Sequence, residues 1–376
     1  PVWPFMPPET AVPSTPPPPS PPRELFNLWY VGVFIMSIGT LCQAIGANLQ
    51  RLSANREAAL PPEHRQPARK RPLFVSGVVL MVGAGIVSAT ALIFSAQSLL
   101  APLILLIFVA NPVCAWIINK EPFNWRTDGL CTALVIASVA VVVAFAPQHS
   151  ASYTAEHMKW LFKQPSWFVF ISLIAATILA AYLTKRRVLR RIGGDWSKLT
   201  NIWDRTIVHL SFGVLGGTFG GLNITLTKTT FTLIIDEFED GTSGNGDFFG
   251  GLGSMFSSWL LYLVGFSLLG TFLLELKCTT DGLQFSSAMI VVSTLAVVEE
   301  VIATLGALLY FQDYNLFSLR NAIIFACANL LAISCVIAMA VMRLRVAPTV
   351  TVPSLKTGTV SWTQAESAAS LDAPCA

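Results

Sequence analysis

The chain has 376 residues, of which 53% are hydrophobic and only 12% are charged. A soluble domain carries roughly 25% charged residues, so this composition excludes an ordinary soluble protein and indicates helices in a lipid bilayer. The net charge of +3 is small, so we expect no nucleic-acid partner. The seven cysteines lie mostly in apolar runs without a CxxC motif, which argues against a disulfide framework or a zinc site.

Three regions are expected along the chain. Residues 1–27 are rich in proline and predict a disordered or polyproline-like tail, neither a signal peptide nor a membrane span. Residues 28–342 are expected to form the transmembrane domain, and residues 343–376 a polar, disordered tail. Because the chain begins with proline, an upstream segment that carries the initiating methionine is left open.

Apolar runs that could cross about 30 Å of hydrocarbon as helices recur about nine times. The clearest pair is a hairpin, Leu99–Ile118 and Gly129–Ala146, joined by the polar turn NKEPFNWRTD. The remaining spans are expected at Leu28–Leu49, Leu73–Ser95, Trp167–Leu183, Thr206–Leu226, Met255–Leu274, Phe285–Tyr310 and Leu319–Met342. The predicted fold class is therefore all-α, a polytopic membrane protein.

Glycines at regular spacing predict close helix packing in two of the spans, because they let another backbone approach. They recur every seven residues in the first span and every four in the sixth, at Gly32, Gly39 and Gly46, and at Gly213, Gly217 and Gly221.

The segments between the spans differ in charge. A basic loop is expected from Arg51 to Arg71, and an acidic, glycine-rich loop over Lys228–Ser254. Most Lys and Arg residues follow the odd-numbered spans, so the positive-inside rule places the C-terminus in the cytosol and the N-terminus outside or in a lumen. The acidic loop would then lie outside, either as a plain solvated loop or as a collector of cations.

The two halves of the chain echo each other. Gly39 precedes Arg51 by twelve residues, and Gly216 precedes Lys228 by the same distance. The sequence YFQDYN before the last span also mirrors NKEPFN in the first half. Four spans repeated around a fifth give two copies of opposite orientation, and transporters built in this way bind substrate near the midplane, between the repeats.

A family resemblance rests on several of these residues. Ala101-Pro102 opens an uncharged span that ends with Asn119-Lys120-Glu121, which resembles the drug/metabolite transporter superfamily and, within it, the NIPA-type magnesium transporters. The stretches NLQRLS at Asn48 and DGLQFSSAMIVV at Asp281 also fit this family. The resemblance extends from Leu28 to Met342 and implies nine spans and a transported Mg²⁺ ion or similar divalent cation.

The candidate ion ligands are Glu299 and Glu300, in mid-span, where the family usually has apolar or hydroxyl residues. A charge at that depth costs at least about 2.5 kcal/mol, which marks a functional site. Neighbouring helix residues point about 100° apart, so we expect only one of them to face the pathway. Carboxylate and amide oxygens suit partly hydrated Mg²⁺, and Gln43 and Asn111 are candidate amides. In the alternative, the glutamates are protonated or bonded between helices.

Asn111 also precedes Pro112, and a proline within a span predicts a simple kink, with a hinge or a ligand site as the alternative.

We therefore expect a membrane transporter of Mg²⁺ or a similar divalent cation that works by alternating access between two helical repeats. One alternative is a transporter of a small organic solute or nucleotide sugar, and another is a scaffold that transports nothing. No GxSxG, HExxH or Walker motif occurs, so neither an enzyme nor a cofactor is expected. The plasma membrane or an endosomal membrane is the expected location, and homo-oligomer formation is left open.

Overall fold

The computed structural model describes residues 28–120, 125, 128–148, 153–191, 202–245, 253, 255–285 and 288–346. Every regular element within these ranges is helical. Eight of the helical stretches are long and apolar enough to cross a membrane, and Gly129–Phe145 is a shorter apolar helix. The prediction of an all-α, polytopic membrane protein is confirmed. The expected tail at residues 1–27 lies outside the described residues.

The elements of the bundle have the following bounds in chain order. They are α1 (Trp29–Ala58), η2 (Pro62–His64), η3 (Ala68–Lys70), α2 (Pro72–Phe94), α3 (Gln97–Leu100), η4 (Ala101–Leu106), α4 (Ile107–Asn119), α5 (Asp128–Phe145), α6 (Ala155–Leu161), α7 (Pro165–Arg191), α8 (Ile202–Asn245), α10 (Trp259–Phe285), α11 (Ala288–Leu305), η6 (Gly306–Tyr310), η7 (Asp313–Leu316) and α12 (Leu319–Val346).

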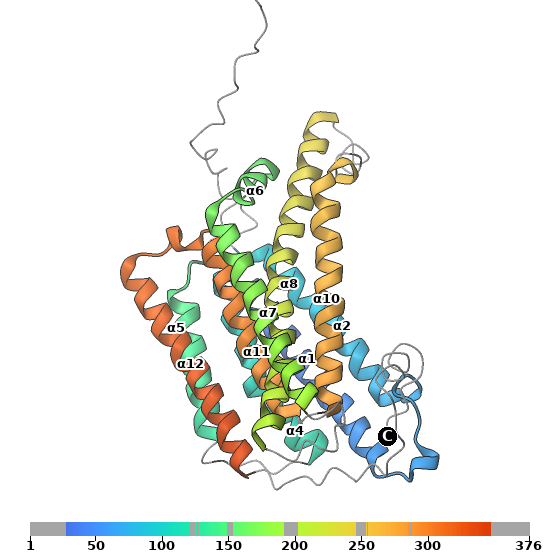
Figure 1. The fold of residues 1–376 in the computed structure, drawn as a ribbon. Helices are drawn as coiled ribbons and strands as arrows, with labels where there is room; N and C mark the ends of the chain where they lie inside the picture. The colour runs from blue at the N-terminus through green and yellow to red at the C-terminus, as the bar shows by residue number, and fades with distance from the viewer. Residues whose placement is uncertain are drawn as a thin grey trace, which may run out of the picture.

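The two halves of the chain pack their helices in the same way (Figure 1). In the first half α1 packs along α2 and against α4, and in the second half α8 packs along α10 and α11. The last helices of the halves, α5 and α12, pack against each other. Each half thus uses its first helix as the centre on which its second and third helices lie.

The predicted glycine contacts between α1 and α2 are confirmed. A Cβ atom added to Gly46 would lie 2.8 Å from the carbonyl oxygen of Gly77, and one added to Gly77 would lie 2.7 Å from that of Gly46. On α8, a Cβ atom at Gly213 or Gly221 would lie 2.6 Å from the Cβ of Thr294 or Ile302 of α11. No larger residue fits these positions without separating the helices.

The predicted acidic loop after the sixth span is wrong over most of its length. Helix α8 continues to Asn245, and it lies beside α10 where both project beyond most of the bundle (Figure 1). The hydroxyls of Thr229 and Thr232 donate to carbonyls four residues back at 2.9 Å, which satisfies them inside the helix. The carboxylate of Asp236 is buried and accepts the N–H of Ala155 at 2.6 Å. This acid therefore anchors the start of α6 rather than attracting ions.

Several other predicted spans also differ from the structure in their bounds or helix type. Helix α1 runs to Ala58 rather than Leu49, because its end is held to the start of α2 by an ion pair of Glu57 with Arg71 at 3.4 Å. The third span is a tighter 3₁₀-helix in η4 and an α-helix in α4, which continues through Pro112. Helix α12 runs to Val346, so the first residues of the expected C-terminal tail are helical, and 347–376 lie outside the described residues.

Candidate cation site

A cavity of about 100 Å³ lies between the two halves of the bundle. That volume holds several water molecules. The first half contributes α1, α2 and the start of η4, and the second half contributes α8, α10 and α11. Its polar lining residues are Thr40, Gln43, Ser88, Asn223, Thr227, Glu275, Thr279 and Glu299. None of the lining residues is Lys, Arg or His, so the fixed charges in this cavity are acidic.

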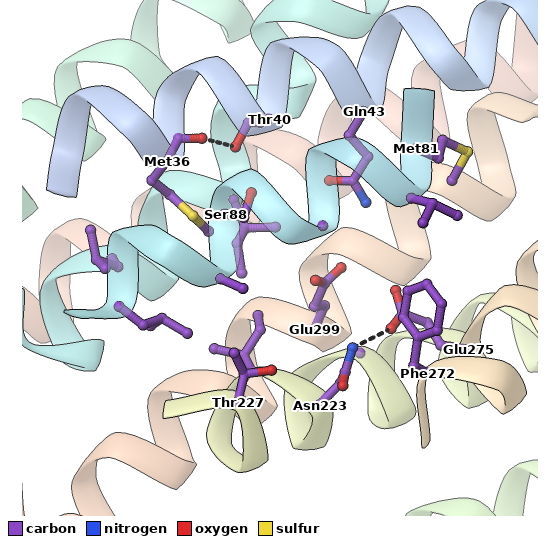
Figure 2. Close-up of a pocket in the computed structure, with 18 of the residues that line it drawn as sticks. Met36, Thr40, Gln43, Met81, Ser88, Asn223, Thr227, Phe272, Glu275 and Glu299 are labelled. Carbon is purple, nitrogen blue, oxygen red and sulfur yellow. Dashed lines mark hydrogen bonds between the residues drawn. The ribbon is translucent and has the colours of Figure 1, made fainter. Parts of the chain in front are cut away.

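Two carboxylates from different helices, Glu299 of α11 and Glu275 of α10, converge in this cavity (Figure 2). A Cβ atom added to Gly220 would lie 3.1 Å from the Cδ of Glu299 and 3.3 Å from the Cδ of Glu275. The two carboxyl carbons therefore cannot be farther apart than the sum of these distances. Because Gly220 has no side chain, α8 leaves room for both carboxylates above its backbone.

The second half also supplies the hydrogen bond that orients one carboxylate. The side-chain amide of Asn223 donates to Oε2 of Glu275 at 3.3 Å, as the dashed line in Figure 2 shows. Oε2 of Glu299 is buried and has no hydrogen-bond partner among the described residues. A buried carboxylate oxygen without a partner is free to bind an ion or water.

Glu299 and Glu300 are neighbours in the sequence but have different surroundings in the structure. Glu299 lines the cavity, whereas Glu300 does not. Glu300 is 1% exposed and accepts a hydrogen bond from the hydroxyl of Thr304, four residues along the same helix, at 3.0 Å. The rotation of about 100° between neighbouring helix residues separates their surroundings.

The two predicted amides also have different surroundings. Gln43 lies in the wall of the cavity on α1, across from Glu299 (Figure 2). Asn111 does not line the cavity; its Oδ1 accepts the side-chain amide of Asn48 at 2.7 Å. Asn48 Oδ1 in turn accepts the amide of Asn119 at 2.8 Å. These three asparagines therefore hold α1 against α4, and Asn111 belongs to a contact between helices.

Comparison with known proteins finds a family similarity in the first half of the chain. Residues 27–192 match the family model described as Magnesium transporter NIPA. Over this range, which is less than half of its length, the chain is similar to the NIPA family. The matched range runs from α1 through α7 and includes Ala101-Pro102 and the turn at Asn119, whereas Glu275 and Glu299 lie beyond it. No curated protein and no solved structure matches the chain.

The donor atoms in the cavity are of the kind that a hard cation prefers. Among the described residues there is no group of three or more His, Cys, Asp or Glu side chains that could enclose a metal. Mg²⁺ does not need such a cage, because it keeps several waters and takes one or two carboxylates from a protein. The cavity offers two carboxylates, several amide and hydroxyl oxygens, and space for water. These match the ligands that Mg²⁺ prefers.

Glu275 was not among the predicted site residues, because the predicted seventh span ended at Leu274. The helix continues to Phe285, which places Glu275 within the bundle. The usable signal was spacing: Phe272, Glu275 and Thr279 are three and four residues apart and share one face of a helix. All three line the cavity, whereas Phe266, Leu269 and Leu273 of the same helix are exposed.

Proposed function

We propose that this NIPA-type protein carries Mg²⁺ or a similar divalent cation through the cavity between its halves, with Glu299 and Glu275 as its carboxylate ligands. The convergence of these two side chains over Gly220, with no basic residue in the cavity lining, is the observation that carries the proposal. The charge of a divalent cation matches that of two ionised carboxylates. The charges of the ion and of the protein therefore compensate each other inside the membrane, where either charge alone has a high free-energy cost.

The size of the cavity supports a partly hydrated ion. A volume of about 100 Å³ leaves room for waters that Mg²⁺ gives up reluctantly. Gln43, Asn223 and Thr227 add neutral oxygens around the carboxylates. Such a site binds the ion without dehydrating it fully, so the ion can still be released on the other side of the membrane.

The place of the cavity supports an alternating-access mechanism. Its walls come from both halves of the bundle, so a rocking motion of one half against the other would expose the same ligands to each side in turn. The charge asymmetry of the sequence supports a cytosolic end of α7, with its four exposed arginines, and an external or lumenal end of α8.

The alternatives are less well supported. A nucleotide sugar carries phosphates, and the cavity lining offers no basic side chain to bind them. Pockets for organic ligands usually measure about 300–1,000 Å³, several times the volume found. A scaffold without transport would be expected to have a solid apolar core between the halves, where this chain has buried carboxylates.

Uptake into proteoliposomes tests the proposal. The full chain should take up Mg²⁺ in preference to a panel of nucleotide sugars and small organic solutes. The double variant Glu275→Gln/Glu299→Gln should lose this uptake, because glutamine keeps the shape of the side chain and removes its charge. Uptake of an organic solute without Mg²⁺ uptake, or undiminished Mg²⁺ uptake by the folded double variant, would overturn it.

A further inference from the structure

A second buried polar cluster lies next to the cavity, outside its lining. Its members are Gln97 and Ser98 of α3, Lys228 of α8 and Asp313 of η7, and each is at most 3% exposed. The backbone N–H of Ser98 donates to Oδ2 of Asp313 at 3.3 Å. Thr227 and Leu100 line the cavity. Lys228 directly follows Thr227, and Ser98 lies two residues before Leu100. Two members of the cluster are thus close in sequence to residues that line the proposed ion pathway.

Each member of this cluster has a buried polar atom without a hydrogen-bond partner among the described residues. These atoms are Gln97 Oε1, Ser98 Oγ, Lys228 Nζ and Asp313 Oδ1. Buried polar groups in proteins are almost always paired, so a local concentration of unpaired ones indicates a bound water or ion. Three of the four atoms are oxygens, the donors that Mg²⁺ and Ca²⁺ prefer.

The Lys228 ammonium is a buried cation held by two features. It lies 4.6 Å from the centre of the Phe311 ring, which attracts a cation to its face. The negative charge of Asp313 acts on it as well. The same charge reaches Tyr153, outside the spans: burial first, and then Asp313, raise the pKa of the Tyr153 hydroxyl. The charge of Asp313 therefore acts on both Lys228 and Tyr153.

We propose that Asp313 and Ser98 form a second binding site for the divalent cation, with the Lys228 ammonium as a tethered ion that competes for it. This inference rests on the proposed function, because it gives the same cation a further site beside the cavity. An arriving ion takes the place of the ammonium as the counter-charge of Asp313 and gains the unpaired oxygens as ligands. When the ammonium returns, its charge repels the ion and helps to release it.

The number of bound ions tests this site. The full chain in lipid nanodiscs is titrated with Mn²⁺ as a paramagnetic probe, and bound Mn²⁺ per chain is counted by EPR. At Mn²⁺ concentrations that leave this site empty in the wild type, Lys228→Met, which lacks the competing ammonium, should bind one ion more. The double variant Lys228→Met/Asp313→Asn should return to the wild-type count. An unchanged count in Lys228→Met would overturn the proposal.

A second background separates this inference from the cavity site. With Glu275→Gln/Glu299→Gln already present, adding Lys228→Met should still add one ion, because the second site has its own ligands. If Glu275→Gln/Glu299→Gln does not lower the number of bound Mn²⁺ ions, the cavity proposal fails. The effect of Lys228→Met on that number can still be measured. If Lys228→Met adds no ion in either background, the second site fails and the cavity proposal is untouched.

A matched control and a stability measurement complete the test. Lys185 is also partly buried over an aromatic ring, with Nζ 3.8 Å from the centre of Phe212, but it is not part of the cluster. Lys185→Met should leave the count unchanged, and an extra ion here would show a general charge effect and contradict the proposal. If Lys228→Met unfolds without cations, Mg²⁺ should raise its melting temperature more than that of the wild type, since binding to the folded state stabilises it. If Mg²⁺ does not raise the melting temperature of Lys228→Met more than that of the wild type, the proposal is also overturned.

Discussion

Glu299 and Glu275 belong to different helices, yet their carboxyl carbons both lie within 3.3 Å of the place where a Cβ atom on Gly220 would stand. Two carboxylates this close repel each other in a cavity with little water. A cation between them removes the repulsion, so this arrangement favours the ion-bound state over the empty one.

Gly220→Ala should weaken cation binding while the protein stays folded. The added methyl group would lie 3.1 Å from Glu299 Cδ, and crowding of this kind costs about 1 kcal/mol. We expect the KM for Mg²⁺ uptake to rise about fivefold. Gly216→Ala is the matched control, because its methyl group would meet the movable Leu295 Cδ1 at 3.0 Å instead of a carboxylate. Equal effects of the two variants would contradict this role for Gly220.

Mg²⁺ uptake should weaken as the pH falls. Only ionised carboxylates bind the cation strongly, and a proton on Glu275 or Glu299 competes with it. The apparent affinity should therefore decrease with acidity in the wild type, and this dependence should flatten in Glu275→Gln/Glu299→Gln. Uptake by wild-type proteoliposomes is measured across a pH series with constant Mg²⁺. An affinity that stays constant, or improves on acidification, would argue against carboxylate ligands.

Gly217→Leu should lower the stability of the bundle. A Cβ atom at this position would collide with the carbonyl oxygen of Leu295 and lie 2.8 Å from the Cβ of Val298. A leucine must therefore separate α8 from α11, and overpacking of this kind costs about 1–3 kcal/mol or more. The melting temperature and folded yield in detergent should both fall. A wild-type melting temperature would mean that α8 and α11 do not pack through this glycine.

The ends of α7 and α8 should lie on opposite sides of the membrane. Single cysteines that replace Arg186 and Asp240 in a cysteine-free background are labelled with an impermeant reagent in intact cells. We expect labelling at Asp240 only, with Arg186 labelled after the membrane is opened, because basic residues stay in the cytosol. Labelling of both positions from one side would contradict the orientation.

The positions of the helices could be predicted because apolar runs and glycine spacing are local signals. The glycines at Gly46 and Gly217 indicated which helix faces pack closely, and the structure supplied their partners, Gly77 and Leu295. The end of α8 could not be predicted, because its threonines and Asp236 look like loop residues until their bonds to carbonyls and to Ala155 are known.

The composition of the candidate site was only half predictable. The acidic pair on α11 marked the depth of a site in the membrane, but the rotation of the helix decides which glutamate faces the cavity. Glu275 lies 24 residues before Glu299 in the sequence, and the two meet only because α10 and α11 both pack on α8. Such a meeting depends on tertiary packing, which spacing along the chain does not encode.

The most direct test compares two neighbouring residues. Glu299 lines the cavity, whereas Glu300 is bonded within its own helix to Thr304. Mg²⁺ uptake is measured for Glu299→Gln and Glu300→Gln at matched folded amounts. Charged contacts of this kind contribute about 1.5–3 kcal/mol, so Glu299→Gln should reduce apparent affinity about 10- to 100-fold. Glu300→Gln should remain close to the wild type. Equal loss in both variants, or loss in Glu300→Gln alone, would contradict the assignment of the cavity as the cation site.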